Sequence, residues 1–408
     1  MSPHILSGIC ILLLLSYVFD LTAQKTRIPS VLLLLIVGWA IKQLLIFLDL
    51  GFPDLEPILP LLGTAGLVLI VLEGSLELKW NKENRPVFIE ALISAILQLL
   101  LVTSGLAFFF TWYFGIGFHQ ALINVLPLTV ISSAIVIPSS RDLPGKRPAF
   151  LTIESTISDV AGILLFNILA ENDSFKMGLV FSTFRDLAVT VLISLAAVWI
   201  LVILMDRIRH HVKFLPIILT LMLFYTVTKE WHLPSLTLVL LFGLLLSNIH
   251  ILSPLQKYLS FSNEVVSAEV PGFKRITGEL TFLVRSLFFL SFGSSININE
   301  FLNESNLVLA AIIIISGTII RAGVLWLFPG SYLRLWPFAP KGLITILLFM
   351  SIPDELKIGA ISKPLVVLVV IGSILMMFFR SDGKMPRPEE EGVASREEEG
   401  MATDTHTG

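Results

Sequence analysis

Asp159 lies near the middle of an apolar run, residues 149 to 171, that is long enough to cross a membrane as a helix. A carboxylate at that depth is costly to keep ionised unless a proton or a metal cation neutralises it, so it is typical of an ion carrier. Ser155 lies one helical turn earlier on the same face, where its hydroxyl oxygen suits a hard cation such as Na⁺. The alternative is a structural acid that Lys341 or a backbone group holds permanently.

Five other ionisable residues interrupt apolar runs, namely Glu73, Glu154, Arg285, Arg321 and Lys341. Each costs roughly 2.5 to 3.5 kcal/mol at the centre of a span on insertion scales, so each is expected to have a partner. Counting inward from the expected cytoplasmic ends puts Glu154 level with Arg321, and Glu73 level with Arg285. The sequence therefore predicts two salt bridges that compensate buried charge, with Lys341 near the level of Asp159.

Two apolar runs look poorly suited to a regular helix. The fifth run contains Thr129, Ser132, Ser133 and Pro138, and the twelfth contains the stretch Trp336–Gly342 with two prolines. Proline removes backbone donors and glycine relaxes the chain, so both runs are predicted to be broken helices. Half-helices that cross would present their dipole ends to an ion, whereas proline kinks without function are the alternative.

The elements that must position these residues are membrane helices. Of 408 residues, 55% are hydrophobic and only 14% are charged, with a mean hydropathy of +0.87, so the apolar groups exceed what one water-soluble domain could bury. A net charge of −3 leaves no basic field for nucleic acid, and the single cysteine, Cys10, excludes disulfide frameworks and cysteine metal clusters. The fold class predicted is an all-α polytopic membrane protein.

Thirteen apolar runs are long enough to serve as spans. Their approximate limits are 4 to 23, 29 to 48, 57 to 78, 87 to 114, 118 to 139, 149 to 171, 187 to 206, 214 to 229, 233 to 250, 279 to 298, 305 to 327, 334 to 352 and 359 to 380. The first run has no basic residue before it and no cleavage pattern after it, so it is interpreted as a retained span. Residues 1–380 are expected to form the membrane domain, and residues 381–408, rich in Pro and Glu, a disordered cytoplasmic tail.

Basic residues in the loops predict the orientation. One set of alternate loops holds fifteen Lys and Arg: Lys25, Arg27, Lys79, Lys82, Arg85, Arg141, Lys146, Arg147, Arg207, Arg209, Lys213, Lys257, Lys274, Arg275 and Arg334. The other set holds five: Lys176, Arg185, Lys229, Lys357 and Lys363. Because positive charge gathers on the cytoplasmic side, the N-terminus is predicted to lie outside and the C-terminus inside.

An internal repeat is indicated by two matching segments. Ile28–Gly38 resembles Leu233–Gly243, with Pro and Gly at the same spacing, and Leu72–Leu76 resembles Ser291–Ser295. The copies lie seven spans apart, and an odd displacement means that they run oppositely through the bilayer. The alternative is that Pro-Ser followed by leucines is a common way for membrane helices to start. We predict inverted repeats of six spans, joined by span seven.

At these residues the chain resembles the monovalent cation:proton antiporter superfamily, in particular its sodium/proton exchanger branch. Thr26–Leu33 resembles the opening of the family's second span, and Leu72–Leu78 the end of its third. The stretch Glu154–Asp159 is similar to the exchanger pattern Glu-Ser-x-x-Asn-Asp, whose last Asp carries the ion. Arg321 resembles the arginine that pairs with the glutamate, and Lys341-Gly342 stands where the family commonly has Arg-Gly.

The resemblance implies a core of spans 4–6 and 11–13 that moves against a scaffold of spans 1–3 and 8–10, with span seven as a linker and the scaffold forming a homodimer. It also implies Asp159 and Ser155 as cation ligands, with Glu73 as a contributor, which competes with the pairing of Glu73 and Arg285. The sequence departs from the family at Ser158, which replaces the Asn. The family's Thr-Asp-Pro of span five is also absent, and Thr129 or Ser133 could occupy its place.

The resulting prediction is a secondary antiporter of the cell membrane (plasma or inner membrane) that exchanges a monovalent cation, Na⁺ first, for H⁺ at Asp159 without a cofactor. One central acid instead of two favours one-for-one, electroneutral exchange. The rival is a non-transporting cation or pH sensor with a degenerate antiporter fold. An intramembrane enzyme is disfavoured because no His-Glu-x-x-His or Gly-x-Ser-x-Gly pattern occurs in the sequence.

Overall fold

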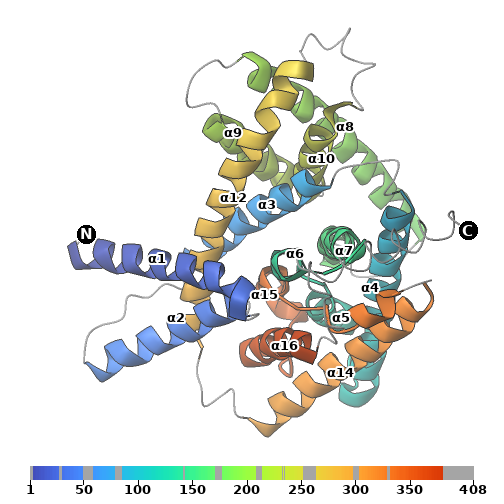
Figure 1. Ribbon diagram of the computed structural model, residues 1–408. Coiled ribbons are helices and arrows are strands. Elements are labelled where there is room, and N and C mark those ends of the chain that lie inside the picture. Colours follow the sequence, from blue (N-terminus) through green and yellow to red (C-terminus); the bar gives the residue numbers. More distant parts are fainter. Residues whose placement is uncertain are drawn as a thin grey trace, which may run out of the picture.

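The described part of the chain is helical, and the computed structural model contains no strand within it (Figure 1). The structure describes residues 3–26, 30–48, 58–78, 85–140, 143–170, 177–207, 214–231, 233, 235–250, 263–296, 303–328 and 331–379. The tail predicted at residues 381–408 lies outside these ranges. So do Arg27, Lys79, Lys82, Arg141, Lys176, Arg209, Lys213 and Lys257, which contribute to the predicted orientation.

A helix or a broken helix of these ranges corresponds to each of the thirteen predicted spans, although some boundaries differ, so the all-α fold class is confirmed. They are α1 (Pro3–Thr26), α2 (Ser30–Phe47), α3 (Leu59–Glu77), α4 (Arg85–Phe114), α5 (Phe118–Val125), α6 (Ser133–Ser140), α7 (Arg147–Ala170), α8 (Met177–Arg207), α9 (Phe214–Glu230), α10 (Ser235–Ser247), α12 (Asn263–Ser294), α14 (Glu304–Trp326), α15 (Leu343–Met350) and α16 (Lys363–Met376). Short 3₁₀ helices are η3 (Leu126–Leu128), η5 (Ser331–Leu335), η6 (Asp354–Leu356) and η7 (Met377–Phe379). Within the described residues, six helical segments are long and apolar enough to cross a membrane on that criterion alone.

Many large apolar side chains lie on the outside of the helices. Phe47, Phe108, Trp112 and Trp326 are all exposed, on α2, α4 and α14. In water such a surface would be unstable, but against lipid it needs no covering, and a helix satisfies its own backbone hydrogen bonds there. The exposed apolar surface therefore agrees with a chain that spans a membrane.

Helix α12 differs most from its predicted span. It begins at Asn263, sixteen residues before the predicted start at 279, and runs to Ser294. Its first half carries charged residues such as Lys274, which pairs with Glu77 at 3.1 Å, and Arg275, which pairs with Glu279 at 3.1 Å. Hydropathy detects the part of a helix that suits lipid, and a polar extension of the same helix has no such signal.

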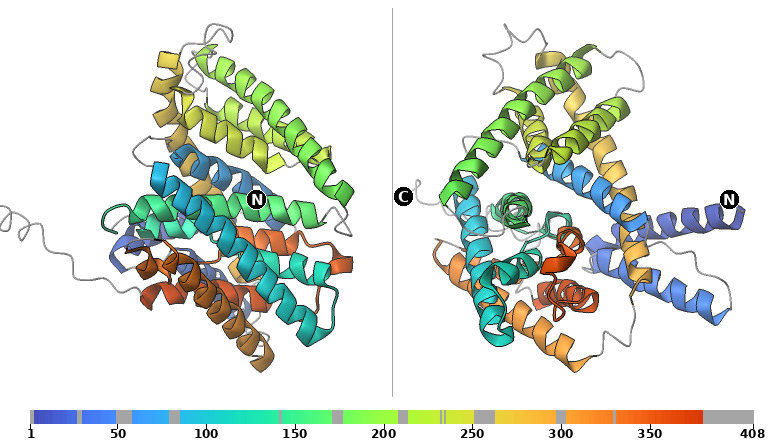
Figure 2. Two further views of the ribbon diagram at one scale, coloured as in Figure 1. Left: turned by 90° about the vertical axis from the view of Figure 1, so that its right-hand side faces the viewer. Right: turned by 180° about the vertical axis from the view of Figure 1, so that it is seen from behind.

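The helices pack in two groups that meet along α7. In one group α12 packs against α2 and α3, and α10 packs against α3 and α8. In the other, α4 packs against α7 and α14, and α14 packs against α16 (Figures 1 and 2). Helix α7 contacts α3 and α10 of the first group, so the helix that carries Asp159 lies at the boundary between them.

Matched glycine contacts bear out the predicted inverted repeat. In α2 a side chain at Gly38 would clash with the carbonyl group of Leu290 on α12, and one at Gly293 would clash with Leu35 on α2. The equivalent Gly243 on α10 faces Leu72 and Ser75 on α3. At Gly38 and Gly293 the neighbouring backbone approaches closely, and at Gly243 the Ser75 side chain fills the space that a Cβ would need. Span two thus meets span ten as span nine meets span three.

Spans five and twelve are broken, as predicted. Span five consists of α5, the short η3, an unwound stretch from 129 to 132, and α6. Span twelve consists of η5, a stretch without helical structure from 336 to 342, and α15. In Figure 1 α5, α6 and α15 lie together beside α7 and α16. The two interruptions fall at equivalent places in the two repeats.

Candidate functional site

The two unwound stretches cross and bind each other through the backbone. The Ser132 N–H donates to the Pro340 carbonyl oxygen at 2.9 Å. A side chain at Gly342 would clash with Ser132, so this crossing requires a glycine. The backbone groups that proline and unwinding leave without helical partners are thus used to join spans five and twelve.

Asp159 lies directly against this crossing and is 3% exposed. Its Oδ2 accepts a hydrogen bond from the Ser133 N–H at 3.0 Å, at the first residue of α6. Its Oδ1 is buried and has no hydrogen-bond partner. A helix N-terminus carries a partial positive charge, which favours the carboxylate but leaves one oxygen free to bind a proton or a cation.

Lys341 places a positive charge at the C-terminal end of the first half of span five. Its ammonium donates to the Thr129 carbonyl oxygen at 2.7 Å, where the first half of span five ends, and its backbone N–H donates to Ser373 at 2.8 Å. Carbonyl groups at a helix C-terminus carry a partial negative charge, which a cation stabilises. The described ion pairs include none between Lys341 and Asp159, whereas a backbone group, the Ser133 N–H, does hold one oxygen of Asp159.

The predicted pair of Glu154 and Arg321 is present and completely buried. Arg321 Nη2 lies 2.9 Å from Glu154 Oε2, and Nη1 donates to Oε1 at 3.1 Å. Ser94 donates to Oε1 at 2.6 Å, and Gln98 Oε1 accepts from Arg321 Nη1 at 2.7 Å. Arg321 Nε also donates to the Leu335 carbonyl oxygen at 3.2 Å. The pair therefore joins α4, α7 and α14 to the end of η5, where span twelve begins to unwind.

The predicted pair of Glu73 and Arg285 is not formed. Arg285 Nη2 lies 3.8 Å from Asp20 Oδ1 on α1, and Nη1 lies 3.5 Å from the Ala134 carbonyl oxygen on α6. Equal depth was the basis of the prediction, but the direction of each side chain around its helix decides the partner. Arg285 extends toward α1 and α6, and the Glu73 carboxylate lies beside α12 near Gly278.

The hydroxyl residues of the predicted site divide into two roles. Ser158 accepts a hydrogen bond from the Ile131 N–H at 3.0 Å, and so holds the unwound stretch that follows η3. Ser155, fully buried one turn before Asp159, donates to the Leu151 carbonyl oxygen at 2.8 Å, which leaves its oxygen able to act as a ligand. Thr129 bonds Thr103 at 2.8 Å through its side chain. The sequence left open whether Thr129 or Ser133 occupies the place of the family's Thr-Asp-Pro. In the structure the backbone of Ser133 contacts Asp159.

Three buried polar residues near the site were not predicted from the sequence. Ser94 and Gln98 lie four residues apart on α4, a spacing that puts both on one face and could have indicated a polar contact. Asn124, near the end of α5, joins span five to the segment between α15 and α16, because its amide donates to the Leu356 carbonyl oxygen at 2.7 Å and accepts from the Ile358 N–H at 3.1 Å. No sequence signal distinguishes Asn124 from other polar residues in an apolar run.

Comparison with known proteins identifies the family and the fold. The family described as "Sodium/hydrogen exchanger, transmembrane" matches residues 10–380 of the chain. The fold is similar to the structure of the sodium proton antiporter MjNhaP1 from Methanocaldococcus jannaschii at pH 8, with a TM-score of 0.68, 16% identity, and coverage of 91% of this chain and 95% of that one. An electron-microscopy structure of the same antiporter gives a TM-score of 0.62 at 17% identity, covering 93% and 96%.

A relative found by sequence carries the name "Probable Na(+)/H(+) antiporter 2" and also comes from Methanocaldococcus jannaschii. It is 31% identical over 150 residues, which are 35% of this chain and 34% of that protein. The chain therefore matches only about a third of the length of this relative. At identities of 16% and 17% the two solved structures show the fold alone.

Proposed function

Because the chain belongs to the sodium/hydrogen exchanger family, whose members are transporters and not enzymes, we propose that it exchanges a monovalent cation for H⁺ across a membrane. Na⁺ is the leading cation, since the relatives that share its fold or sequence are named as sodium/proton antiporters. In this proposal Asp159 binds either the cation or a proton, so that the two compete and travel in opposite directions. The ions are substrates, and exchange of this kind needs no cofactor.

The observation that carries the proposal is the environment of the Asp159 carboxylate. One oxygen is held by the Ser133 N–H at 3.0 Å, and the other is buried without a partner, beside the crossing of two broken helices. An ionised carboxylate in such a place is stable only with a second positive partner. A proton and a Na⁺ ion are interchangeable in that respect, and this supports alternation between them.

The remaining coordination of Na⁺ would come from oxygens near the crossing. Ser155 is the leading second ligand, because it shares the Asp159 face of α7 and its oxygen keeps lone pairs. Ser158 and Ser133 support the site by holding the unwound backbone, and the Thr129 carbonyl oxygen is engaged by Lys341. Glu73 is retained as a contributor from the other helix group, since it forms no ion pair with Arg285.

Alternation also needs the site to open to each side in turn. We propose that spans 4–6 and 11–13 move as a core against spans 1–3 and 8–10, which form the scaffold of a homodimer, with span seven as the linker. Contacts between α3 and α7 and between α15 and α3 are where the two groups would slide. The excess of Lys and Arg in alternate loops supports an outside N-terminus and a cytoplasmic C-terminus in the plasma or inner membrane.

The test is exchange by purified protein in proteoliposomes that hold a pH gradient. Adding Na⁺ should dissipate the pH gradient in vesicles that contain wild-type protein. Asp159→Asn should abolish this dissipation, because the Asn amide does not ionise and so cannot bind a proton and a cation in turn. Asp354→Asn is the matched control, since Asp354 is exposed and forms its ion pair with Lys357, just after η6. Normal exchange by Asp159→Asn would refute the carrier assignment. Cation binding by wild-type protein without any exchange would favour the non-transporting sensor.

A further inference from the structure

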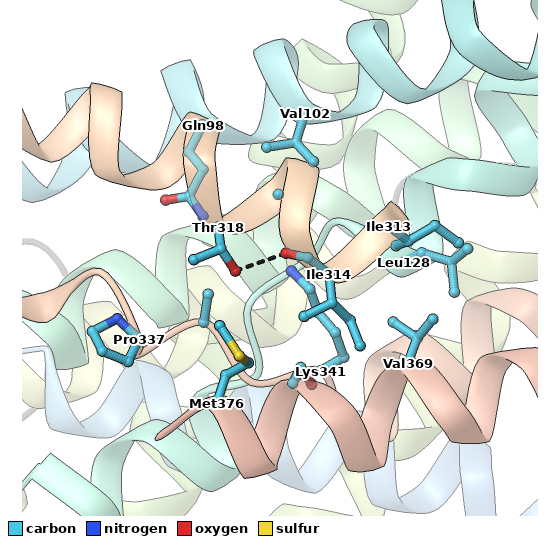
Figure 3. A pocket seen from close by; sticks show the side chains of 13 residues that line it. Gln98, Val102, Leu128, Ile313, Ile314, Thr318, Pro337, Lys341, Val369 and Met376 are labelled. Atoms are coloured by element: carbon cyan, nitrogen blue, oxygen red, sulfur yellow. Dashed lines mark hydrogen bonds between the residues drawn. The ribbon is translucent and has the colours of Figure 1, made fainter. Parts of the chain in front are cut away.

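A small cavity lies beside Lys341, on the core side of the crossing. It has about 20 Å³ of space for the centre of a water molecule and lies between α4, α14, α16 and the unwound stretch of span twelve. Its lining includes Gln98, Gly317, Thr318, Lys341, Ser373 and Met376. In Figure 3 Gln98, Thr318 and Lys341 gather at one end of this cavity, and the apolar side chains of Ile313, Leu128 and Val369 lie at the other. Asp159 is not part of this lining.

Three polar groups at that end could each bind a water molecule. Gln98 uses its oxygen to accept from Arg321, which leaves its amide hydrogens for the cavity. Lys341 uses one N–H for the Thr129 carbonyl oxygen and keeps two more. Thr318 donates to the Ile314 carbonyl oxygen at 2.7 Å, so its own oxygen can still accept. The end of the cavity thus offers two donors and one acceptor.

The size and the polarity of the cavity together decide which ligand it can hold. A buried water needs roughly 10 to 15 Å³ of such space and two to four polar partners, whereas apolar cavities stay dry. The cavity by Lys341 meets both conditions, and it is too small for an organic ligand of even a few heavy atoms. A single water molecule is therefore the ligand that its chemistry and volume suit.

We propose that this cavity binds one water molecule, which accepts hydrogen bonds from Gln98 and Lys341 and donates one to Thr318, and that Gln98 is thereby a positioning residue for exchange. Through Arg321, Gln98 is tied to the fixed ion pair with Glu154. Through the water it restrains the ammonium that caps the first half of span five. The fixed pair and the unwound backbone beside Asp159 are thus joined. This inference rests on the proposed exchange function.

The water itself is tested by X-ray radiolysis in solution. Radicals formed from a bound water oxidise the side chains next to it, and Met376, which lines the same cavity, is readily oxidised to the sulfoxide. Gly317→Ala adds a methyl group to the lining, where its Cβ would lie 3.7 Å from the nearest side-chain atom of Val102, so it fits without a clash. Gly323→Ala is the matched control on the same helix, because a Cβ there meets nothing within 4 Å.

We expect Met376 oxidation to fall in Gly317→Ala and to stay at the wild-type level in Gly323→Ala. Exchange by Gly317→Ala should fall roughly tenfold, the size expected for losing one hydrogen bond to a charged group. Its thermal midpoint should equal or exceed that of wild type, because alanine favours a helix more than glycine does. Gln98→Met, which removes both the donor and the acceptor of the side-chain amide, should also slow exchange.

A merely structural role for this region predicts the opposite pattern, in which the more stable Gly317→Ala exchanges as fast as Gly323→Ala. That result, or equal oxidation of Met376 in wild type and Gly317→Ala, overturns the water site. Failure of the proposed function is distinguishable from both. If wild-type protein showed no exchange at all, exchange would be refuted, while the oxidation of Met376 would still decide whether the cavity holds water.

Discussion

Glu154 and Asp159 are two acids on one helix, five residues apart and both buried, yet their surroundings differ in kind. Glu154 accepts hydrogen bonds from Ser94 and from both terminal nitrogens of Arg321. Asp159 accepts one hydrogen bond from the backbone of Ser133, and its second oxygen has no partner. Both are buried carboxylic acids, and what separates them is the number of donors and the presence of a guanidinium at Glu154 alone.

The difference shows how a membrane protein assigns roles to buried charge. A carboxylate that is fully bonded to a fixed guanidinium has no capacity for a further positive partner. Removing either member of this ion pair leaves the other charge buried and uncompensated. A carboxylate with one open oxygen can take and release such a partner. The Glu154 region thus holds α4, α7, α14 and η5 together, and the Asp159 region is where we propose that ions exchange.

The largest expected difference is in the free energy of unfolding of two single variants, in each of which one of the acids is changed to its amide. Glu154→Gln should lower the free energy of unfolding by about 3 to 5 kcal/mol, because Arg321 would remain buried without its counter-charge. Asp159→Asn should change it by less than about 1 kcal/mol, since it removes an acid that is only half bonded. Thermal unfolding of both variants in the same detergent measures the contrast.

Replacing both members of the fixed pair provides the control for that contrast. The double variant Glu154→Met with Arg321→Leu removes both charges and should recover much of the lost stability, since apolar replacement of a buried pair is often neutral. Equal destabilisation by Glu154→Gln and Asp159→Asn would show that the two acids do not differ in role.

A smaller effect is expected at Ser158, which supports the open site. Ser158→Ala would leave the buried Ile131 N–H without its acceptor, at a cost of about 1 to 3 kcal/mol. Ser158→Asn, which restores the residue type of the exchanger pattern, keeps an oxygen acceptor and should lose less. Thermal midpoints together with exchange assays check this, and a stable Ser158→Ala protein would show that the unwound stretch is held by other contacts.

The smallest effect is expected from the membrane potential. If Asp159 is the one exchanging acid, one cation moves for one proton and no net charge crosses, so an imposed potential should leave the exchange rate unchanged. Net movement of one charge would instead couple exchange to about 2.3 kcal/mol per 100 mV. A potassium gradient with valinomycin, applied in either direction to the same proteoliposomes, distinguishes the two cases.

Much of the fold follows from the sequence because its signals are local. Apolar runs of span length marked the helices, and Pro337, Pro340 and Gly342 marked a break that the structure contains. The first half of α12 was missed because a polar helix has no hydropathy signal. Within the site, depth alone predicted the pair of Glu154 and Arg321 but gave the wrong partner for Arg285, which lies near Asp20.

By itself the sequence determined that the chain spans a membrane with helices in inverted repeats, and that a few charges are buried in it. These conclusions depend on composition and on position along the chain. Only the tertiary structure decided which partners those charges have: Ser133 for Asp159, Thr129 for Lys341, and Gln98 for Arg321. The reason is that hydrogen bonds depend on helix rotation and on distances of about 3 Å, which arise only when segments distant in sequence pack together.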